Sequence, residues 1–286
     1  GLSLVLVLIA VSVLIVEARV RGQATLHRVS SGVRRPAPMV RLGRWRWPGL
    51  LLSFGVVLAS LGLPLVVLGY WCVRQVLTHV TSPHLLQASQ TSVLLGAGAA
   101  IIAGVAAVPI SVISVRHPSA QTRFLERSTY LTYALPGIVI AIAFVAITVH
   151  TPWYQTLGVL MVACACRYAA QVVGATRVSL LQISPRVEEA ARGLGSTLPG
   201  VLWRVTLPLV RPGWFAGILL VFLTTIKELP ITLLLIPAGD RSLPTLIWTA
   251  AGDARYGEAA VPALLLVAIT AVPTYVLAHR RQALAT

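Results

Sequence analysis

Three charged residues interrupt apolar stretches of this chain. Arg167 falls in the run 154–174, and Lys227 and Glu228 are adjacent in the run 213–237. A charged side chain at the centre of a bilayer costs about 2.5–3.5 kcal/mol on insertion scales, so such residues need partners or water. Two roles are open: an Arg167–Glu228 ion pair that holds helices together, or a path or gate lined by Lys227 and Glu228.

A second pattern lies in the segment 175–212, between two apolar runs. Ser184-Pro185 is an N-cap followed by proline at the first helical position, and Glu188 and Glu189 fall near the positive end of the predicted helix. The helix is predicted to be amphipathic, because its apolar residues follow the i, i+3, i+4, i+7 spacing: Val187, Ala190, Ala191 and Leu194.

The rest of this segment predicts a second short helix. Gly195 is a suitable end for the first helix, Pro199 can open the second, and Leu207-Pro208 is expected to end it. Such a pair of short helices can present its small-residue face to a groove on a partner, or it can rest on the membrane surface. The periodicity leaves both readings open.

The sequence shows no pattern typical of a nucleotide-binding, metal or catalytic site. The sequence contains no Gly-rich Lys-Ser/Thr phosphate loop, so we expect neither ATP nor another cofactor to bind this chain. The six histidines show no metal-ligand spacing on one helix, and three cysteines imply no disulfide framework. No Ser/His/Asp or paired-carboxylate site stands out. We therefore predict a protein that is not an enzyme and has no catalytic or metal site.

The composition indicates what must position these residues. Of 286 residues, 57% are hydrophobic and 11% are charged, against about 25% charged residues in soluble proteins. So few charges cannot cover a water-soluble fold of this length, which excludes ordinary soluble enzymes and nucleic-acid binders. The remaining class is an all-α polytopic membrane protein whose apolar surface faces the lipid bilayer.

Apolar runs give the expected organisation. The first run, 1–16, reads as a partial transmembrane helix, the probable end of a preceding half, and the basic segment 17–47 reads as a cytoplasmic linker. A six-span domain then covers 48–281, with the 175–212 loop inside it. The six expected spans are 48–71, 91–115, 130–150, 154–174, 213–237 and 259–279.

The net charge of +15 is explained by where the basic residues lie. Eighteen of the 23 basic residues fall in the linker, in alternate loops and in the C-terminal tail, whereas the opposite loops hold three. This asymmetry is the positive-inside pattern, so we expect the linker, the 175–212 loop and the C-terminus to be cytoplasmic. The excess charge thus encodes orientation, and no nucleic-acid partner is predicted.

The 175–212 loop also carries a longer motif. It reads Glu189-Ala190-Ala191, three residues, Gly195, nine residues, then Val205-Thr206-Leu207-Pro208. This resembles the EAA motif of ABC importer permeases, in which Ile stands where this chain has Val205. The resemblance implies a coupling helix that docks on an ATP-hydrolysing subunit, with Glu189 engaging a basic residue there. The implied coupling residues are Glu188, Glu189, Ala190, Ala191, Gly195, Val205, Leu207 and Pro208.

Further segments resemble the ferric-iron permeases of this superfamily. They are Tyr133–Val139 (YALPGIV), Ile226–Pro230 (IKELP) and Tyr256–Ala260 (YGEAA). In those proteins two six-span halves are commonly fused, and this chain resembles the second half plus the last helix of the first. The fold implied is the six-span type I importer bundle. Permeases for thiamine, polyamines or phosphonates are close relatives and remain alternatives.

These observations predict a permease subunit of an ATP-driven ABC importer in the bacterial inner membrane, with ferric iron as the best guess for its cargo. The implied partners are ATP-binding subunits at the loop 185–208, which would hold ATP and Mg, a second permease half, and an extracytoplasmic solute-binding protein that docks on 72–90 and 238–258. The competing class is an ATP-independent secondary transporter that uses Lys227 and Glu228 as a relay.

Overall fold

The computed structural model describes residues 43–77 and 84–283, with the backbone alone over 279–283. The predicted partial helix 1–16 and nearly all of the linker 17–47 lie outside the described residues. The boundaries predicted for the linker and the six-span domain stay predictions.

The chain divides into two compact units, Gly1–Phe54 and Gly55–Thr286. In the first unit the structure describes the short 3-10 helix η1 (Gly43–Trp45) and the start of α2 (Arg46–Val57). The second unit holds the remaining elements, all of them helical within the described ranges. In chain order these are the π turn η2 (Leu58–Gly62), α3 (Leu63–Leu77), α4 (Leu85–Arg116), α5 (Ala120–Ala134), α6 (Gly137–Thr148), α7 (Leu157–Leu181), α8 (Pro185–Gly193), α9 (Leu198–Val201), the π turn η3 (Leu202–Thr206), α10 (Leu207–Thr225), α11 (Pro230–Leu235), α12 (Leu243–Gly252) and α13 (Tyr256–Ala283).

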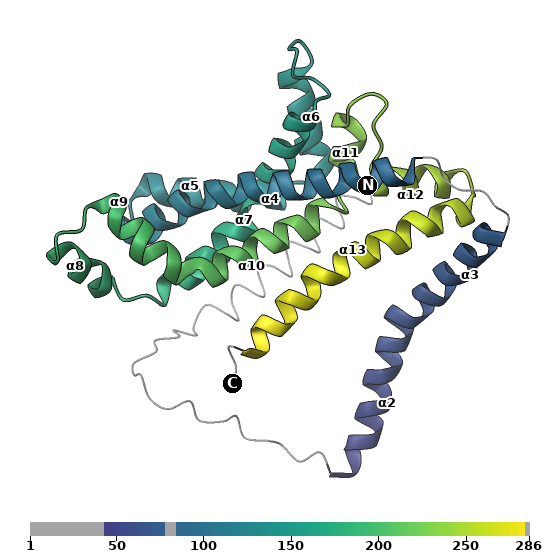
Figure 1. Cartoon of the computed structure of the whole chain (residues 1–286), viewed down its shortest axis with the longest axis horizontal. Coiled ribbons are helices and arrows are strands. Elements are labelled where there is room, and N and C mark those ends of the chain that lie inside the picture. The colour runs from purple at the N-terminus through teal and green to yellow at the C-terminus, as the bar shows by residue number, and fades with distance from the viewer. Residues whose placement is uncertain (1–42, 78–83, 284–286) are drawn as a thin grey trace, which may run out of the picture. The chain divides into compact units, whose positions relative to one another are not determined.

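The core of the second unit is the packing of α4, α7 and α10, which run side by side (Figure 1). Alanines dominate the buried face of α4, and alanines also lie on the buried face of α7; such small residues let apolar helices approach closely. At Gly217 of α10 a Cβ would lie 2.6 Å from Val172 Cα on α7, so glycine is required there. Trp214 Nε1 donates a 2.8 Å hydrogen bond to the Gly104 carbonyl, which ties α10 to α4.

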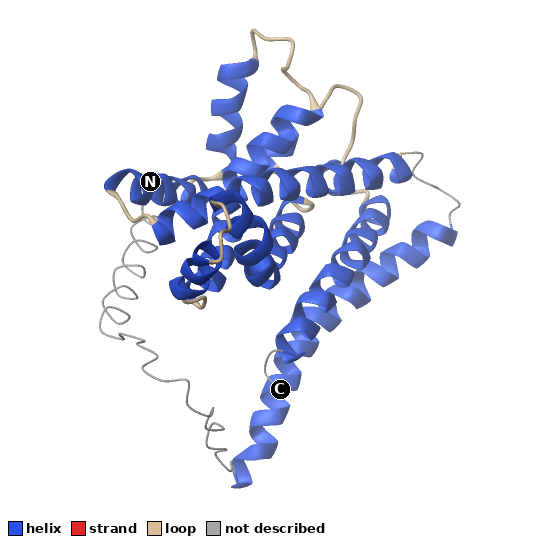
Figure 2. Cartoon of the chain, turned by 60° about the vertical axis from the view of Figure 1, so that its left-hand side comes forward, coloured by secondary structure: helices blue, strands red, loops and turns tan. Residues whose placement is uncertain are grey.

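In a second group of helices, α13 packs against both α3 and α12, and α3 and α13 run side by side (Figures 1 and 2). No residue of α3 is buried. In the most apolar stretch of α13, 11% of the residues are buried. Their exposed side chains are large and apolar, such as Val66, Val73, Val272 and Tyr275. Surfaces of this kind suit lipid or another apolar helix.

Four predicted spans are found as long helices, but two are interrupted. The expected span 130–150 is split into α5 and α6, whose axes differ by 109°. The break falls at Leu135, which is extended (φ −70°, ψ 142°) because the following proline disfavours helical backbone. The expected span 213–237 was also predicted as continuous; instead α10 ends at Thr225 and α11 begins only at Pro230.

Counted by length and apolarity, five helices in the described residues are able to cross a membrane, or six if the bent α5–α6 pair forms one span. This agrees with the predicted all-α membrane bundle. Two helices lie in segments that were predicted as loops: α5 begins within the predicted basic loop after α4, and α12 lies within 238–258. Both begin at a serine that forms a reciprocal capping box with a threonine three residues later.

Candidate functional site

The segment between α7 and α10 forms the predicted pair of short helices. Ser184 caps α8, with its hydroxyl accepting from the Arg186 amide at 3.4 Å. The turn after α8 is left-handed at Gly195, whose φ is +88°. There Ser196 N donates to the Ala191 carbonyl at 3.1 Å and Gly195 N to the Arg192 carbonyl at 2.9 Å, the hydrogen bonds of a Schellman end.

The predicted end of the second helix at Leu207-Pro208 is wrong. The helix that begins at Leu198 continues through the π turn η3 into α10, and Leu207 N donates to the Leu202 carbonyl five residues back. Proline has no amide hydrogen and its ring crowds the preceding turn, so the wider π turn accommodates Pro208 without ending the helix. Residues Leu198–Thr225 therefore form one 28-residue helix.

The two adjacent glutamates of α8 have different surroundings. Glu188 points inward and pairs with Arg116 at the end of α4, at 3.0 Å between Oε2 and Nε. Glu189 is exposed and has no hydrogen bond or ion pair within the described residues. Of the other predicted coupling residues, Ala190, Gly195 and Pro208 are exposed, and Ala191, Val205 and Leu207 are half-buried.

The apolar face of this loop is uncovered. Leu194 is 88% exposed and Trp203 is 67% exposed, and Val187 and Leu198 are exposed as well. Figure 1 shows α8 and α9 together at one end of the α4–α7–α10 bundle. The segment thus presents an apolar surface beside a free carboxylate, which suits a protein groove with a basic residue.

The second set of predicted site residues meets at the two helix breaks. Glu228 lies in the non-helical stretch between α10 and α11, not at mid-helix as expected, and its side chain is 7% exposed. Arg167 Nη1 of α7 lies 3.8 Å from Glu228 Oε1, so the pairing hypothesis describes the geometry found. The Tyr168 hydroxyl donates a hydrogen bond to the same carboxylate, and Ile231 N donates to it at 3.4 Å.

Gly137, the first residue of α6, lies against this ion pair. A Cβ on Gly137 would lie 2.8 Å from Glu228 Oε1 and closer still to Arg167 Nη1. Because the α5–α6 break places the glycine there, both broken helices meet at one buried ion pair. Lys227 instead has an exposed side chain with no ion pair or hydrogen bond within the described residues.

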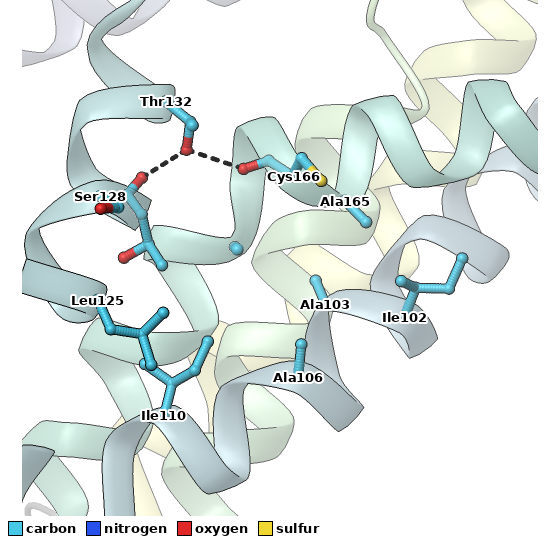
Figure 3. A pocket seen from close by; sticks show the side chains of 11 residues that line it. Ile102, Ala103, Ala106, Ile110, Leu125, Ser128, Thr132, Ala165 and Cys166 are labelled. Atoms are coloured by element: carbon cyan, nitrogen blue, oxygen red, sulfur yellow. Dashed lines mark hydrogen bonds between the residues drawn. The ribbon is translucent and has the colours of Figure 1, made fainter. Parts of the chain in front are cut away.

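A separate cavity of about 250 Å³ opens between α4, α5 and α7 (Figure 3). Its wall is mainly aliphatic, from Ile102, Ile110 and Leu125. The Thr132 hydroxyl on this wall already donates to the Cys166 carbonyl at 2.9 Å. The cavity therefore suits an apolar occupant and offers no charged group to a hydrated ion.

The two segments predicted to dock a binding protein, 72–90 and 238–258, meet in the structure. A cleft of about 280 Å³ has Arg74 and Gln75 at the end of α3 on one side and Arg255 and Glu258 on the other. Arg255 makes ion pairs with Asp253 and Glu258, and Trp71 contacts Tyr256 with ring centroids 5.6 Å apart. No group of three or more metal-ligating His, Cys, Asp or Glu side chains is found over the described residues.

Residues 96–279 match the protein family described as binding-protein-dependent transport system inner membrane component. The chain belongs to this family. The match runs from α4 into α13, so it includes both the α8–α9 segment and the surroundings of Glu228.

Curated relatives of this inner membrane component are named for several cargoes. The Fe(3+)-transport system permease protein FbpB 2 of Haemophilus influenzae is 32% identical over 96% of this chain and 56% of its own length, so the chain spans about half of that relative. A probable molybdenum ABC transporter permease of Haloferax volcanii is 29% identical, covering 86% of this chain and 94% of the relative. The putrescine permease PotI of Escherichia coli is 25% identical over 74% and 81%.

Solved structures agree on the fold of this inner membrane component. A bacterial ABC transporter that imports the acidic polysaccharide alginate matches with a TM-score of 0.64 at 16% identity, covering 86% of this chain and 98% of that chain. The methionine ABC transporter MetNI matches with a TM-score of 0.53 at 16% identity, over 71% and 99%. The predicted fold of an ABC importer permease is confirmed.

Sequence reasoning missed four residues that complete these two sites: Arg116, Gly137, Tyr168 and Thr206, whose hydroxyl donates to Glu188 Oε1 at 3.0 Å. Arg116 ends an apolar helix and looks like one more orientation-setting arginine. Tyr168 follows Arg167 directly, and a buried tyrosine hydroxyl needs a partner, which is a signal available in the sequence. Gly137 follows Leu135-Pro136. This proline indicates a helix break, but the sequence does not show which residues Gly137 contacts.

Proposed function

We propose that this chain is the membrane-spanning translocation subunit of an ATP-driven importer. The observation that carries the proposal is the α8–α9 segment, which keeps the EAA spacing and turns at Gly195 with Glu189 exposed. It stands at one end of the bundle, where a partner can reach it. Closure of two ATP-binding subunits would move this segment and tilt the spans between inward- and outward-facing states.

The partners follow from the same geometry. The ATP-binding subunits would hold ATP and Mg and would dock on the loop 185–208, with Glu189 facing a basic residue of the subunit. A second permease half would cover the exposed apolar surfaces. An extracytoplasmic binding protein would dock on the cleft that holds Arg74 and Arg255. The charge asymmetry of the sequence supports a cytoplasmic C-terminus in a bacterial inner membrane.

For the cargo we propose ferric iron, with molybdate, phosphonate, polyamine or thiamine as alternatives. FbpB 2, at 32% identity over nearly the whole chain, supports iron, while relatives named for molybdenum, 2-aminoethylphosphonate and putrescine support the others. No described cluster of hard oxygen ligands would hold Fe(III) within the bundle. Recognition of the metal is therefore assigned to the binding protein.

Lys227 is assigned to the translocation path. Its side chain is exposed on this chain at the end of a long apolar helix, and a lipid-facing charge is costly. A water-filled path shared with the second half would hydrate it. Arg167 and Glu228 form the buried support beside that path, because their side chains are paired with each other.

A proton- or ion-coupled transporter is the second candidate, supported by the buried Tyr168–Glu228–Arg167 group. The two candidates differ in their energy source. Purification of the tagged chain with its ATP-binding subunits, followed by uptake of radioactive Fe(III) into proteoliposomes with and without ATP, separates them. Uptake that follows an imposed proton gradient and ignores ATP would support the second candidate.

Glu189→Ala tests the coupling role directly. The variant should retain the chain in the membrane but lose the ATP-binding subunit or the ATP-driven uptake. Glu126→Gln, a carboxylate of α5 outside the loop, is the matched control. Normal uptake by both Glu189→Ala and Gly195→Ala would contradict the coupling role. A panel of molybdate, putrescine and thiamine with ATP present tests the cargo separately.

A further inference from the structure

The coupling helix α8 is attached to the membrane bundle in an unusual way. None of its nine residues is buried, so little apolar packing holds it in place. Val187 of α8 and Leu194, which directly follows the helix, are both exposed. The attachment of α8 must therefore come from the chain connections at its two ends and from specific polar contacts.

Those polar contacts converge on Glu188. Its Oε1 accepts hydrogen bonds from Arg116 Nη2 at 3.0 Å and from Arg116 Nε at 3.2 Å, a charge-assisted pair that involves two nitrogens of one guanidinium. The Thr206 hydroxyl donates a third hydrogen bond to Oε1 at 3.0 Å. The side chains of Arg116 and Glu188 are 13% and 17% exposed, so water screens this pair much less than a surface ion pair.

Arg116 has a second partner besides Glu188. Its Nη2 also donates to the Ile183 carbonyl at 3.2 Å, in the short connection between α7 and α8. One guanidinium at the end of α4 thus joins the connection before the coupling helix to the helix itself. Through Thr206, the π turn η3 that leads into α10 is joined to the same carboxylate. The partly buried Arg116–Glu188 pair, together with Thr206, thus links α8 to the ends of α4 and α7 and to the start of α10.

We propose that the Arg116–Glu188 pair is the rigid link that transmits movement of the coupling helix to the spans. Within the proposed function, on which this inference rests, Glu189 faces the ATP-binding subunit and Glu188 does not touch it. Both residues act in coupling, but Glu188 is a positioning residue that works through α4 and η3. Without the pair, α8 would still dock, and its movement would no longer carry the spans with it.

The experiment uses the chain in its complex with the ATP-binding subunits. The variants are Arg116→Ala, Glu188→Ala and the charge-reversed double variant Arg116→Glu/Glu188→Arg. Three quantities are measured: copurification of the ATP-binding subunit, ATP hydrolysed per Fe(III) imported, and the distance distribution between spin labels on Arg186→Cys and Ile113→Cys in a chain whose native cysteines are replaced. The last quantity needs neither ATP nor cargo.

Both alanine variants should keep the subunit bound and hydrolyse ATP, with Fe(III) uptake per ATP lowered about tenfold, a usual size for a coupling energy between sites. The distance distributions between their labels should broaden. The charge-reversed variant restores the ion pair but not the hydrogen bond to the Ile183 carbonyl, so it should narrow the distributions and regain part of the uptake. The matched control is Arg177→Ala/Glu126→Ala, which removes a 3.0 Å ion pair between α7 and α5 and should leave the uptake ratio unchanged.

Separate outcomes test the two proposals. Loss of the ATP-binding subunit from Glu188→Ala would overturn the inference, because Glu188 would then belong to the docking surface. Distance distributions between the spin labels that are as narrow in the alanine variants as in the wild type would also overturn the inference. If the wild-type complex shows no ATP-dependent uptake of any cargo, the proposed function fails, while the label distances still decide whether the pair holds α8 rigidly.

Discussion

Gly137→Ala is the most informative single substitution in the described spans. The added methyl group would lie 2.8 Å from Glu228 Oε1 and closer to Arg167 Nη1, distances at which neighbouring atoms must move. Glu228 cannot move freely, because it is held by the Tyr168 hydroxyl and by Ile231 N. Arg167 is the longer side chain, so we expect its guanidinium to be displaced from the carboxylate.

The magnitude follows from what the displacement breaks. Breaking a buried ion pair by removing one partner costs about 3–5 kcal/mol. Alanine is favoured over glycine within a helix by about 1 kcal/mol, which offsets part of that cost. The net destabilisation at Gly137 is therefore about 2–4 kcal/mol by these two figures. Gly158, in the first turn of α7, is a matched control, because a Cβ there meets only Thr156 Oγ1 at 4.0 Å.

The assay measures the thermal stability of the detergent-purified complex. Its readout is the fraction of the complex that remains assembled after heating. Gly137→Ala should melt well below the wild type, and Gly158→Ala should match or exceed it. In an Arg167→Gln/Glu228→Gln background the Gly137→Ala change should cost little, because no ion pair is left to break. Equal stability of Gly137→Ala and Gly158→Ala in the wild-type background would refute this reasoning.

Three further substitutions test other parts of the structure. Tyr168→Phe should lower the melting temperature of the complex, since it removes a hydrogen bond to buried Glu228 worth about 1–3 kcal/mol; an unchanged value would contradict that contact. Gly217→Ala should reduce the amount of folded protein in the membrane, measured by quantitative blotting, because its methyl group would collide with the Val172 backbone. Gly195→Ala should cost about 1–2 kcal/mol at its left-handed φ and lower uptake per ATP, with binding of the ATP-binding subunit retained.

Much of the coupling segment was predictable from local sequence. Its caps, its small apolar residues and the glycine turn act within a few residues, so Ser184 and Gly195 fix the first helix without help from tertiary contacts. Long spans were predictable for a similar reason, since apolar length alone decides whether a segment can cross a bilayer. The Arg167–Glu228 pair, one of the two roles left open, followed from the cost of unpaired charges inside apolar runs, and the two side chains lie 3.8 Å apart.

The remaining features depend on contacts between distant segments. The resemblance to the EAA motif gives a role to Glu189 but no partner within the chain to Glu188, which pairs with Arg116, 72 residues away. The helix break around Glu228 was missed because Lys227 and Glu228 lie inside the long and otherwise apolar run 213–237, and hydropathy does not show where a helix ends. The continuation of the helix through Pro208 was missed because no local residue pattern predicts a π turn.

The π turn η3 sets the rotational phase between two parts of one helix. A π turn amounts to an α-helix that contains one extra residue, and one residue corresponds to about 100° of rotation about the axis. Because a π turn winds fewer degrees per residue, it absorbs this extra residue and keeps the two flanking parts of the helix in phase. If Leu202–Thr206 wound as a regular α-helix with the same number of residues, the α8–α9 end would turn by about 100° relative to α10, and the contact between Thr206 and Glu188 would be lost. The winding of this five-residue segment therefore decides which way the α8–α9 segment faces relative to α10.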